Sequence, residues 1–379
     1  MSDKMGKAWV MEGPGQLEMR EFPVPKCEKD AILLKVEACG ICGTDKHMFK
    51  GNAGMVEFPI IPGHEFAGTI VELGEDYKKS MLLVDETLEL KVGDRVIVGP
   101  GTKGCGKCPT CLKYPDKPLL CQNRFRYGHS SCNKPPYFLG GYAQYLYVMP
   151  DSWIFKIPDG MSFDLAAMAE PVCIALSVLE RASEGDLPSL GHGMGLGRTV
   201  AVIGAGPIGM LIMAAFKHAG AGKIIAIDML PKKLEMAKEF GADMTIDASL
   251  PIEERQKMIM EANGGELCDV VVEAAGAPIA FRQAIELIRR GGTVIEAGHF
   301  TDGGDIPVNP YMICQKDCQI KGVWANHPAI FRDALNFLDR STVDIEKLAT
   351  HKFGIDDVRE AMDTAGGPEV GKVIIKPWE

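Results

Sequence analysis

Residues 199–228 read TVAVIGAGPIGMLIMAAFKHAGAGKIIAID, and this stretch decides the fold class of the chain. It opens on an apolar, β-branched run at 199–203, of the kind that is buried on both faces of a parallel sheet. A glycine loop at 204–209 follows, then an apolar helical segment, a second apolar strand and Asp228, 19 residues after Gly209. Because a carboxylate at this spacing meets the ribose hydroxyls of adenosine, the stretch predicts a doubly wound α/β domain that binds a dinucleotide.

The glycine loop supplies the contacts expected for a pyrophosphate. Gly204 allows the tight turn, Gly206 lets the backbone approach the phosphates, and Gly209 lets the helix pack closely on the strand. The helix begins at Pro207 and Ile208, where free N–H groups and the positive end of the helix dipole face the phosphates. We therefore expect NAD at this loop.

A membrane span is the alternative explanation of the same stretch. Residues 199–216 hold 18 uncharged positions, which reaches the lower limit for a spanning helix. Three glycines and a proline interrupt that segment, and the acid follows after a second strand. The dinucleotide site therefore explains the pattern better than a membrane helix does.

Composition agrees with a globular enzyme of two domains. The chain has 379 residues, of which 46% are hydrophobic and 24% charged, and its net charge is −10. An acidic chain is a poor partner for nucleic acid. Because the first residues contain no apolar signal core, we expect a cytoplasmic protein without a membrane partner. In that compartment the twelve cysteines favour thiols and metal ligands over disulfides.

The first 150 residues differ from the middle of the chain. Short β-type runs, Ala31–Val36, Phe66–Val71 and Arg95–Val98, are separated by glycine and proline, and Val92–Asp94 marks a turn. This pattern predicts a β-rich domain in front of the α/β domain.

Two segments of this β-rich domain carry side chains that zinc prefers. Cys42 follows Gly40-Ile41, and His64 is followed at once by Glu65. A catalytic zinc needs three protein ligands and one open position, and Glu170, an acid in an apolar stretch, is the candidate for the third ligand. Each residue alone is more often a core or hydrogen-bonded residue, so the hypothesis depends on their combination.

Four more cysteines, Cys105, Cys108, Cys111 and Cys121, stand with two, two and nine residues between them. Three closely spaced thiolates and a fourth that returns to them can make a closed tetrahedral site, whose role is structural. An iron–sulfur cluster and plain free thiols are the alternatives.

Taken together, these motifs resemble the medium-chain zinc-dependent alcohol dehydrogenase family over nearly the whole chain, and within it the polyol (sorbitol) and threonine dehydrogenase branch. The resemblance is carried by Gly40–His47, Gly63–Gly68, the cysteine quartet, Glu170-Pro171 and the glycine loop with Asp228. It implies a GroES-like catalytic domain, 1–172 and 325–379, and a doubly wound Rossmann cofactor domain, 173–324.

The resemblance also implies roles for the candidate metal ligands. Cys42 and His64 are expected to bind the catalytic zinc, and Glu65 to lie beside it as a ligand or a supporting carboxylate. Glu170 matches a position at which the sorbitol-type enzymes have glutamate, which binds zinc directly or through water. The quartet is expected to hold one structural zinc, so that each chain carries two zinc ions.

Further site residues follow from the same family pattern. Thr44 and His47 match the proton relay, and Lys233 is expected to join in ribose recognition. Ala275 and Gly298 follow later predicted strands at their carboxyl ends, where doubly wound sheets bind ligands.

The predicted function is therefore hydride transfer between a secondary alcohol (polyol, cyclic or branched) and NAD. An L-threonine 3-dehydrogenase-like activity, a noncatalytic NAD-binding zinc protein and a zinc-free quinone or enoyl reductase are the alternatives. We expect a homodimer or homotetramer through an edge strand at Ile320–Val323. Residues 75–89 and 183–198 are predicted to be surface insertions, and Gln122–Tyr142 is the segment expected to approach the substrate.

Overall fold

In the computed structural model of the chain, residues 4–54, 56–83, 89–183, 197–324 and 328–379 are described. They form two compact units. The first comprises Met1–Glu170, Ala325–Asp339 and Glu346–Glu379, and the second comprises Pro171–Trp324 and Arg340–Ile345.

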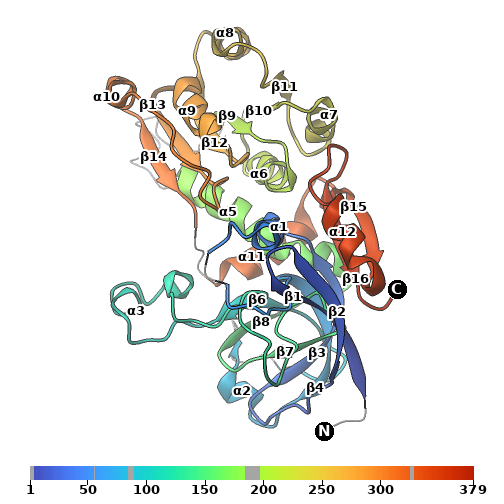
Figure 1. Ribbon diagram of the computed structural model, residues 1–379. Helices are drawn as coiled ribbons and strands as arrows, with labels where there is room; N and C mark the ends of the chain where they lie inside the picture. The colour runs from blue at the N-terminus through green and yellow to red at the C-terminus, as the bar shows by residue number, and fades with distance from the viewer. Residues whose placement is uncertain (1–3, 55, 84–88, 184–196, 325–327) are drawn as a thin grey trace. The chain divides into compact units, whose positions relative to one another are not determined.

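The second unit is built on a parallel sheet of six strands in the order β11-β10-β9-β12-β13-β14 (Figure 1). Its strands are β9 (Thr199–Ile203), β10 (Lys223–Asp228), β11 (Met244–Asp247), β12 (Cys268–Glu273), β13 (Ile288–Glu296) and β14 (Gln319–Gly322). Strand order changes direction between β9 and β12, so this is a doubly wound sheet with its switch point there, as predicted. Ligands of such sheets bind at the carboxyl ends of the strands beside the switch point.

One helix, α5, precedes the first strand of this sheet, and five helices connect its strands. The six are α5 (Ala169–Ser183), α6 (Pro207–His218), α7 (Pro231–Glu239), α8 (Ile252–Ala262), α9 (Pro278–Leu287) and α10 (Pro310–Lys316). Alternate strand residues such as Ala201, Ile225 and Val271 pack against Ile259 of α8 and Ile285 of α9 in one fully buried cluster. A sheet covered in this way needs apolar residues along its strands, which is why β9 and β10 read as continuous hydrophobic runs.

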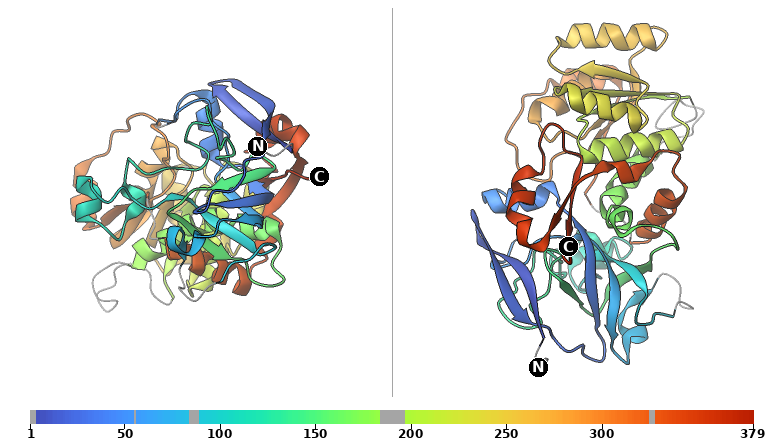
Figure 2. Two further views of the ribbon diagram at one scale, coloured as in Figure 1. Left: turned by 90° about the horizontal axis from the view of Figure 1, so that it is seen from below. Right: turned by 90° about the vertical axis from the view of Figure 1, so that its right-hand side faces the viewer.

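The first unit contains a sheet in the order β15-β16-β3-β4-β6-β8-β5, with β7 paired to β3, and a separate hairpin, β1–β2. The hairpin is the dark blue pair in Figure 2. The strands are β1 (Met5–Gly13), β2 (Gln16–Pro23), β3 (Ile32–Gly40), β4 (Glu65–Leu73), β5 (Leu82–Leu83), β6 (Arg95–Thr102), β7 (Tyr145–Val148), β8 (Ser152–Lys156), β15 (Ala349–Gly354) and β16 (Lys372–Lys376). Residues from both ends of the chain share its core, because β16 pairs with β3.

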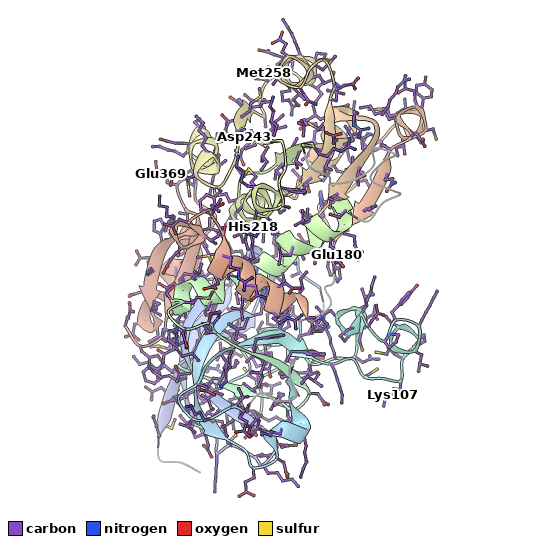
Figure 3. The ribbon with its side chains drawn as sticks, turned by 180° about the vertical axis from the view of Figure 1, so that it is seen from behind. Lys107, Glu180, His218, Asp243, Met258 and Glu369 are labelled. Atoms are coloured by element: carbon purple, nitrogen blue, oxygen red, sulfur yellow. The ribbon has the colours of Figure 1, made fainter. Side chains whose placement is uncertain are left out.

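Short helices complete the first unit. They are α1 (Gly43–Lys50), α2 (Tyr77–Ser80), α3 (Pro109–Lys113), η1 (Pro118–Leu120), α4 (Phe163–Ala167), α11 (Ile330–Arg340), η3 (Ile345–Leu348), η4 (Ile355–Asp357) and α12 (Val358–Thr364). The segment with α3 and η1 forms a lobe that extends away from the sheet of its own unit, with Lys107 labelled on it in Figure 3.

The predicted insertion at 75–89 is partly integrated into the fold. Residues 77–80 form α2, Met81 is buried, and β5 pairs with β8 at the sheet edge. The prediction of a purely surface insertion was therefore wrong for residues 77–83, because Met81 supplies an apolar anchor and Leu82 continues the sheet. Most of the second predicted insertion, residues 184–196, lies outside the described residues. Among the described helices, none combines the length and the apolar character that crossing a membrane requires.

Candidate active site

Cys42 is positioned by the start of α1. It caps the helix in an extended conformation, and the Asp45 carboxylate accepts a hydrogen bond from the Cys42 backbone N–H at 2.9 Å. This reciprocal cap fixes the turn that presents the thiol. Thr44 follows on the first turn, with its Oγ1 3.5 Å from Cys42 Sγ.

His64 and Glu65 are delivered by the start of β4, which runs antiparallel to β3. Gly63 precedes them with φ +91°, and a Cβ there would lie 2.5 Å from the Tyr142 ring, so glycine is required for this approach. One donor atom from each of Cys42, His64 and Glu65 lies within 4.8 Å of the other two. We call these three residues the Cys–His–Glu group.

The surroundings of His64 carry negative charge. Burial alone would lower the pKa of His64, yet the charges of Cys42, Asp45 and Glu170 raise it well above its ordinary value. Asp45 is fully buried, and its Oδ1 lies 3.8 Å from His64 Nδ1. His64 Nδ1 is itself buried without a hydrogen-bond partner among the described residues. An environment that favours a positive charge on His64 is also one that favours a bound cation.

Glu65 is paired with Lys372 of β16, a contact that no local sequence pattern announces. The Lys372 ammonium donates to Glu65 Oε1 at 2.6 Å and lies 2.5 Å from Oε2, and both side chains are buried. Gly40 makes room for this pair, because a Cβ there would clash with Glu65 Oε2. A buried carboxylate that already has a lysine partner can support a metal site or turn towards the metal itself.

Glu170 opens α5 at the edge of the first unit. Burial raises the pKa of Glu170 to about 7, and the charge of His64 opposes that shift. In the described chain, its carboxylate is not among the donor atoms that come within 4.8 Å of one another at the Cys–His–Glu group. The charges of Glu170 and His64 therefore influence each other, but the carboxylate that lies within 4.8 Å of the Cys42 and His64 donor atoms is that of Glu65.

The donor set fits a catalytic zinc. A thiol, an imidazole and a carboxyl group converge here, the last two of them buried, and the hydroxyl of Thr44 lies beside the thiol. Three protein ligands leave a fourth tetrahedral position for a substrate oxygen.

Thr44 and His47, the predicted relay residues, lie three positions apart on α1 and therefore share one face of that helix. His47 Nδ1 lies 3.2 Å from Asn52 Oδ1 in an exposed contact. The helix thus provides a hydroxyl beside the thiol and an imidazole at the surface.

The cysteine quartet also converges. One sulfur from each of Cys105, Cys108, Cys111 and Cys121 lies within 4.8 Å of the others, and Cys108 and Cys121 are 3.9 Å apart. Four sulfurs bound tetrahedrally at about 2.3 Å from zinc stand about 3.8 Å apart, whereas a disulfide needs about 2.05 Å. All twelve cysteines are free thiols in the structure. The spacing therefore fits a closed zinc site.

Backbone amides around the quartet favour thiolates. The N–H groups of Lys107 and Cys108 lower the pKa of Cys105 to about 6. The Cys111 N–H also donates to Cys108 Sγ at 3.4 Å, and the Cys105 N–H donates to Cys121 Sγ at the same distance. The pKa of Cys111 shifts the other way. The Gly106 N–H lowers it, but burial and the hydrogen bonds with the other sulfurs outweigh this and raise the pKa of Cys111 to about 12. Four thiols this close cannot all ionise without a cation between them.

In the second unit, the glycine loop joins β9 to α6 as predicted. Gly204 has φ +100°, and its Cα faces the loop after β12, where a Cβ would lie 2.7 Å from Ala275 N. A Cβ on Gly209 would lie 1.9 Å from the Gly204 carbonyl oxygen, so helix and strand touch there. A Cβ on Gly206 would meet nothing within 4 Å, which leaves open space at the amino end of α6, where Pro207 and Ile208 begin the helix. This space is where a pyrophosphate fits.

Asp228 ends β10 and holds the glycine loop. Its Oδ2 accepts a hydrogen bond from the Ala205 N–H at 2.7 Å, and its Oδ1 accepts one from the Leu230 N–H at 2.9 Å. Lys233, on the first turn of α7, is largely buried, and burial lowers its pKa although the charge of Asp228 opposes this. The two residues predicted to recognise the ribose thus interact electrostatically.

At the carboxyl ends of β12 and β13, the predicted loop residues Ala275 and Gly298 donate their N–H groups to carboxylates. Ala275 N–H donates to Glu273 Oε1 at 2.8 Å, and Gly298 N–H donates to Glu296 Oε1 at 3.1 Å. His299 Nδ1 lies 2.9 Å from Glu296 Oε1. Burial and the neighbouring Glu296 raise the pKa of Glu273 to about 8. Sequence reasoning missed this carboxyl pair, since each acid follows an ordinary strand.

The sequence did not identify Asp45 and Lys372 as site residues, and it placed His129 only within the segment Gln122–Tyr142 that was expected to approach the substrate. Two features of the sequence could have identified Asp45: it lies inside the Gly40–His47 motif, and an acid three residues after Cys42 is placed to cap the helix that begins there. Lys372 lies 307 positions from Glu65, and nothing local connects them. The His129 ring lies 5.3 Å from the His64 ring, within the segment that was predicted to approach the substrate.

Comparison with known proteins is consistent with this geometry. The model of the "Alcohol dehydrogenase GroES-like domain" matches residues 28–159, and the model of the "Zinc-binding dehydrogenase" matches residues 207–340. L-threonine 3-dehydrogenase of Alteromonas mediterranea is 32% identical over 95% of this chain and 96% of that protein. Sorbitol dehydrogenase of Bacillus subtilis is 32% identical over 95% of this chain and 93% of that protein. An alcohol dehydrogenase structure from Thermotoga maritima superposes with a TM-score of 0.88 at 30% identity, covering 98% of this chain and 99% of that one.

These matches extend across both units and agree with the two predicted domain types, the GroES-like and the Rossmann-like. They support an enzyme that acts on CH–OH groups, and they set aside the noncatalytic alternative. The chain belongs to the zinc-dependent medium-chain alcohol dehydrogenase family, whose cofactors are zinc and NAD.

Proposed function

We propose that the chain oxidises a secondary alcohol of the polyol class to a ketone and transfers the hydride to NAD. Zinc would be held by Cys42, His64 and a carboxylate from Glu65 or Glu170, and a second zinc by the cysteine quartet. The observation that carries the proposal is the convergence of three zinc-type donors within 4.8 Å beside the Thr44 hydroxyl. Such an arrangement is suited to binding an alcohol oxygen and removing its proton.

When bound, zinc polarises the alcohol oxygen and lowers its pKa, and the nicotinamide ring accepts the hydride. Thr44 orients the substrate hydroxyl and accepts its proton while releasing its own hydroxyl proton towards His47. His47, on the same face of α1, carries the proton to solvent. Asp45 holds the turn of Cys42 and lies behind His64, and Lys372 holds Glu65, so the chain keeps its donors aligned before substrate arrives.

The relatives suggest the chemical class of the substrate. Sorbitol has a hydroxyl on each carbon next to the reacting one, and threonine has an amino group there. Both are secondary alcohols with a polar neighbour. A threonine 3-dehydrogenase-like activity is therefore the second candidate, and a cytoplasmic homodimer or homotetramer belongs to the same proposal.

A substrate panel tests this function. Polyols, vicinal diols, simple secondary alcohols, cyclic alcohols and L-threonine are each offered with NAD⁺ at several pH values, and NADH is followed by absorbance. We expect turnover with polyols or diols above that with simple alcohols. Turnover with L-threonine alone would select the second candidate, and no turnover with any member would reject both.

The metal assignment is tested by substitution. Cys42→Ser removes one expected ligand, so we expect turnover to fall by at least about a thousandfold and the zinc content to drop from two ions to one while the fold is kept. Cys27→Ser is the matched control, because Cys27 is also a partly exposed free thiol of the first unit. Wild-type protein with one zinc, or with iron, would contradict the assignment.

A further inference from the structure

The segment after the quartet holds His129 firmly against the Cys–His–Glu group. Tyr127 is fully buried, and its hydroxyl pairs with Ser152 Oγ at 2.7 Å and accepts from the Met149 N–H at 2.8 Å. Gly128 has φ +75° and packs so closely on Gly63 that a Cβ would lie 2.9 Å from its carbonyl oxygen. The loop is therefore anchored on both sides of the peptide that leads into His129.

The orientation of the imidazole is fixed by its own loop. His129 Nδ1 lies 3.0 Å from the Tyr127 carbonyl oxygen. A carbonyl oxygen can only accept a hydrogen bond, so Nδ1 carries a proton and donates it. Within the described residues nothing hydrogen-bonds Nε2, which stays available to a ligand. The side chain is half-buried, and its ring is tilted by 51° against that of His64 at 5.3 Å between centroids.

His129 is near the expected metal without being one of its donors. In the described part of the chain, neither of its nitrogens lies within 4.8 Å of all the donor atoms of the Cys–His–Glu group. An imidazole beside the donor set, but outside it, can contact a molecule whose oxygen binds the metal.

We propose that His129 Nε2 hydrogen-bonds a second hydroxyl of the substrate, on the carbon next to the reacting one, and so selects vicinal diols and polyols. This rests on the proposed function of the same site and names its specificity residue. A hydroxyl can donate to a bare imidazole nitrogen or accept from a protonated one, so the contact does not depend on the charge of His129. A site built to bind a hydroxyl discriminates strongly against analogues that lack it, because the buried partner is left unpaired.

The test compares two alcohols with one carbon skeleton, 2,3-butanediol and 2-butanol. In His129→Asn the side-chain amide reaches the Nδ1 position, so it keeps the bond to Tyr127 and loses the contact at Nε2. In His129→Gln the amide reaches the Nε2 position. We expect the ratio of kcat/KM for diol over 2-butanol to fall at least about tenfold in His129→Asn and to be largely retained in His129→Gln. His351→Asn, on the edge strand β15, is the control and should leave the ratio unchanged.

A binding readout accompanies the kinetics. The affinity of 2,3-butanediol for the enzyme–NADH complex, in which no hydride can be transferred to the cofactor, is measured by NADH fluorescence. We expect this affinity to weaken in His129→Asn by the same factor as the ratio, with zinc content unchanged. Equal losses for both alcohols, or a loss of zinc, would overturn the inference and make His129 a structural residue.

The proposed function and this inference fail in different ways. If wild-type enzyme oxidises both alcohols with equal efficiency, His129 selects no second hydroxyl, and the function stands without the inference. If it oxidises neither of these two alcohols but does oxidise another polyol, the inference fails alone. If it oxidises no alcohol of the substrate panel, the proposed function and the inference fall together.

Discussion

Asp228 illustrates how one carboxylate can serve both the fold and the cofactor. Its two oxygens accept N–H groups from Ala205 and Leu230, and each oxygen has a further lone pair that a ribose hydroxyl can use. The same charge would repel the 2′-phosphate of NADP. Lys233 lies close and is largely buried, so it is less able to extend towards a phosphate than an exposed lysine would be.

We therefore predict a preference for NAD over NADP of at least about a hundredfold in kcat/KM, which is about 2.7 kcal/mol. Asp228→Gly should reduce or reverse it. Glycine removes both contacts to the loop, so Asp228→Asn is the milder comparison. It keeps an acceptor for the Leu230 N–H, loses the acceptor for the Ala205 N–H and removes the charge, and it should narrow the preference for NAD over NADP while keeping part of the NAD activity. Steady-state kinetics with both cofactors measure this. Equal efficiency of the wild-type enzyme with both would show that Asp228 does not face the ribose.

Some site residues could be identified from the sequence, and others could not. Cys42, His64 and the quartet stand in short motifs, so spacing and side-chain chemistry were enough to nominate them. Asp45 and Tyr142 hydrogen-bond across 97 positions, and Lys372 reaches Glu65 across 307. Such partners are set by strand pairing, chiefly β16 with β3 and β4 with β3, which no local pattern encodes.

At the scale of elements, the quartet lobe depends most directly on a metal. α3 and η1 have five and three residues, and they connect four sulfurs in a lobe with few buried apolar groups other than the cysteines. Helices this short do not persist without tertiary support. A zinc ion bound by the quartet would therefore contribute its binding free energy to the folding of this lobe.

We predict that Cys108→Ser lowers the melting temperature and releases one zinc while leaving the Cys–His–Glu group loaded. Cys27→Ser is the control, because Cys27 is a partly exposed free thiol of the same unit, as Cys108 is, and lies outside both metal groups. Calorimetry with metal analysis on both variants decides the matter. A Cys108→Ser protein that keeps two zinc ions and full stability would refute a structural site.

The carboxyl ends of β12 and β13 give a second element-scale prediction. Glu273 is fully buried beside Glu296, and its pKa is raised to about 8 by burial and by that neighbour, against about 4.3 in an unfolded chain. The folded protein therefore keeps a proton that the unfolded chain releases between these two values. Stability is highest at the acid end of that window and falls as pH rises towards 8.

Glu273→Gln should make the stability less dependent on pH, because the side-chain amide can donate a hydrogen bond to Glu296 at every pH and does not ionise. We expect the melting temperature of the variant, relative to wild type, to rise from pH 5 to pH 8.5. The exposed Glu266→Gln in the same unit should show no such trend. A difference from wild type that stays constant with pH would mean that Glu273 does not hold a proton in the folded state.

The sequence predicted some helices and strands accurately and missed others, and the difference has a physical reason. The stretch from β9 to β10 was found almost to the residue, because buried parallel strands and a glycine loop are written in consecutive positions. β1, β2, β15 and β16 were missed. Burial alternates or is interrupted along β1, β2 and β15, and β16 is a short buried run whose partners, β15 and β3, are set by pairing within the folded sheet. The short β5 was taken for part of a loop, since two residues carry no period.

At the scale of the whole molecule, the edge of the second unit's sheet bears on whether copies of the chain associate. Among the strands that the structure describes, β14 is the last of the six-stranded sheet of the second unit, and its recorded strand partner is β13. Ile320 on this strand and Trp324 just beyond it are 37% and 53% exposed. Exposed apolar side chains at the edge of a sheet form a surface that proteins often bury by pairing. A two-fold axis beside β14 would place it antiparallel to its copy and join two sheets into one.

We therefore predict a dimer or a tetramer of the 41.1 kDa chain in solution, formed through β14. Ile320→Lys places a charge on the edge and should shift the mass measured by light scattering towards the monomer as the protein is diluted. Met260→Lys, an exposed apolar residue of α8, is the matched control and should leave the mass unchanged. If the wild-type chain is a monomer at working concentration, pairing at β14 is ruled out. An Ile320→Lys protein that stays fully assembled would instead move the interface to another surface, and the exposed Trp324 would then need a different explanation.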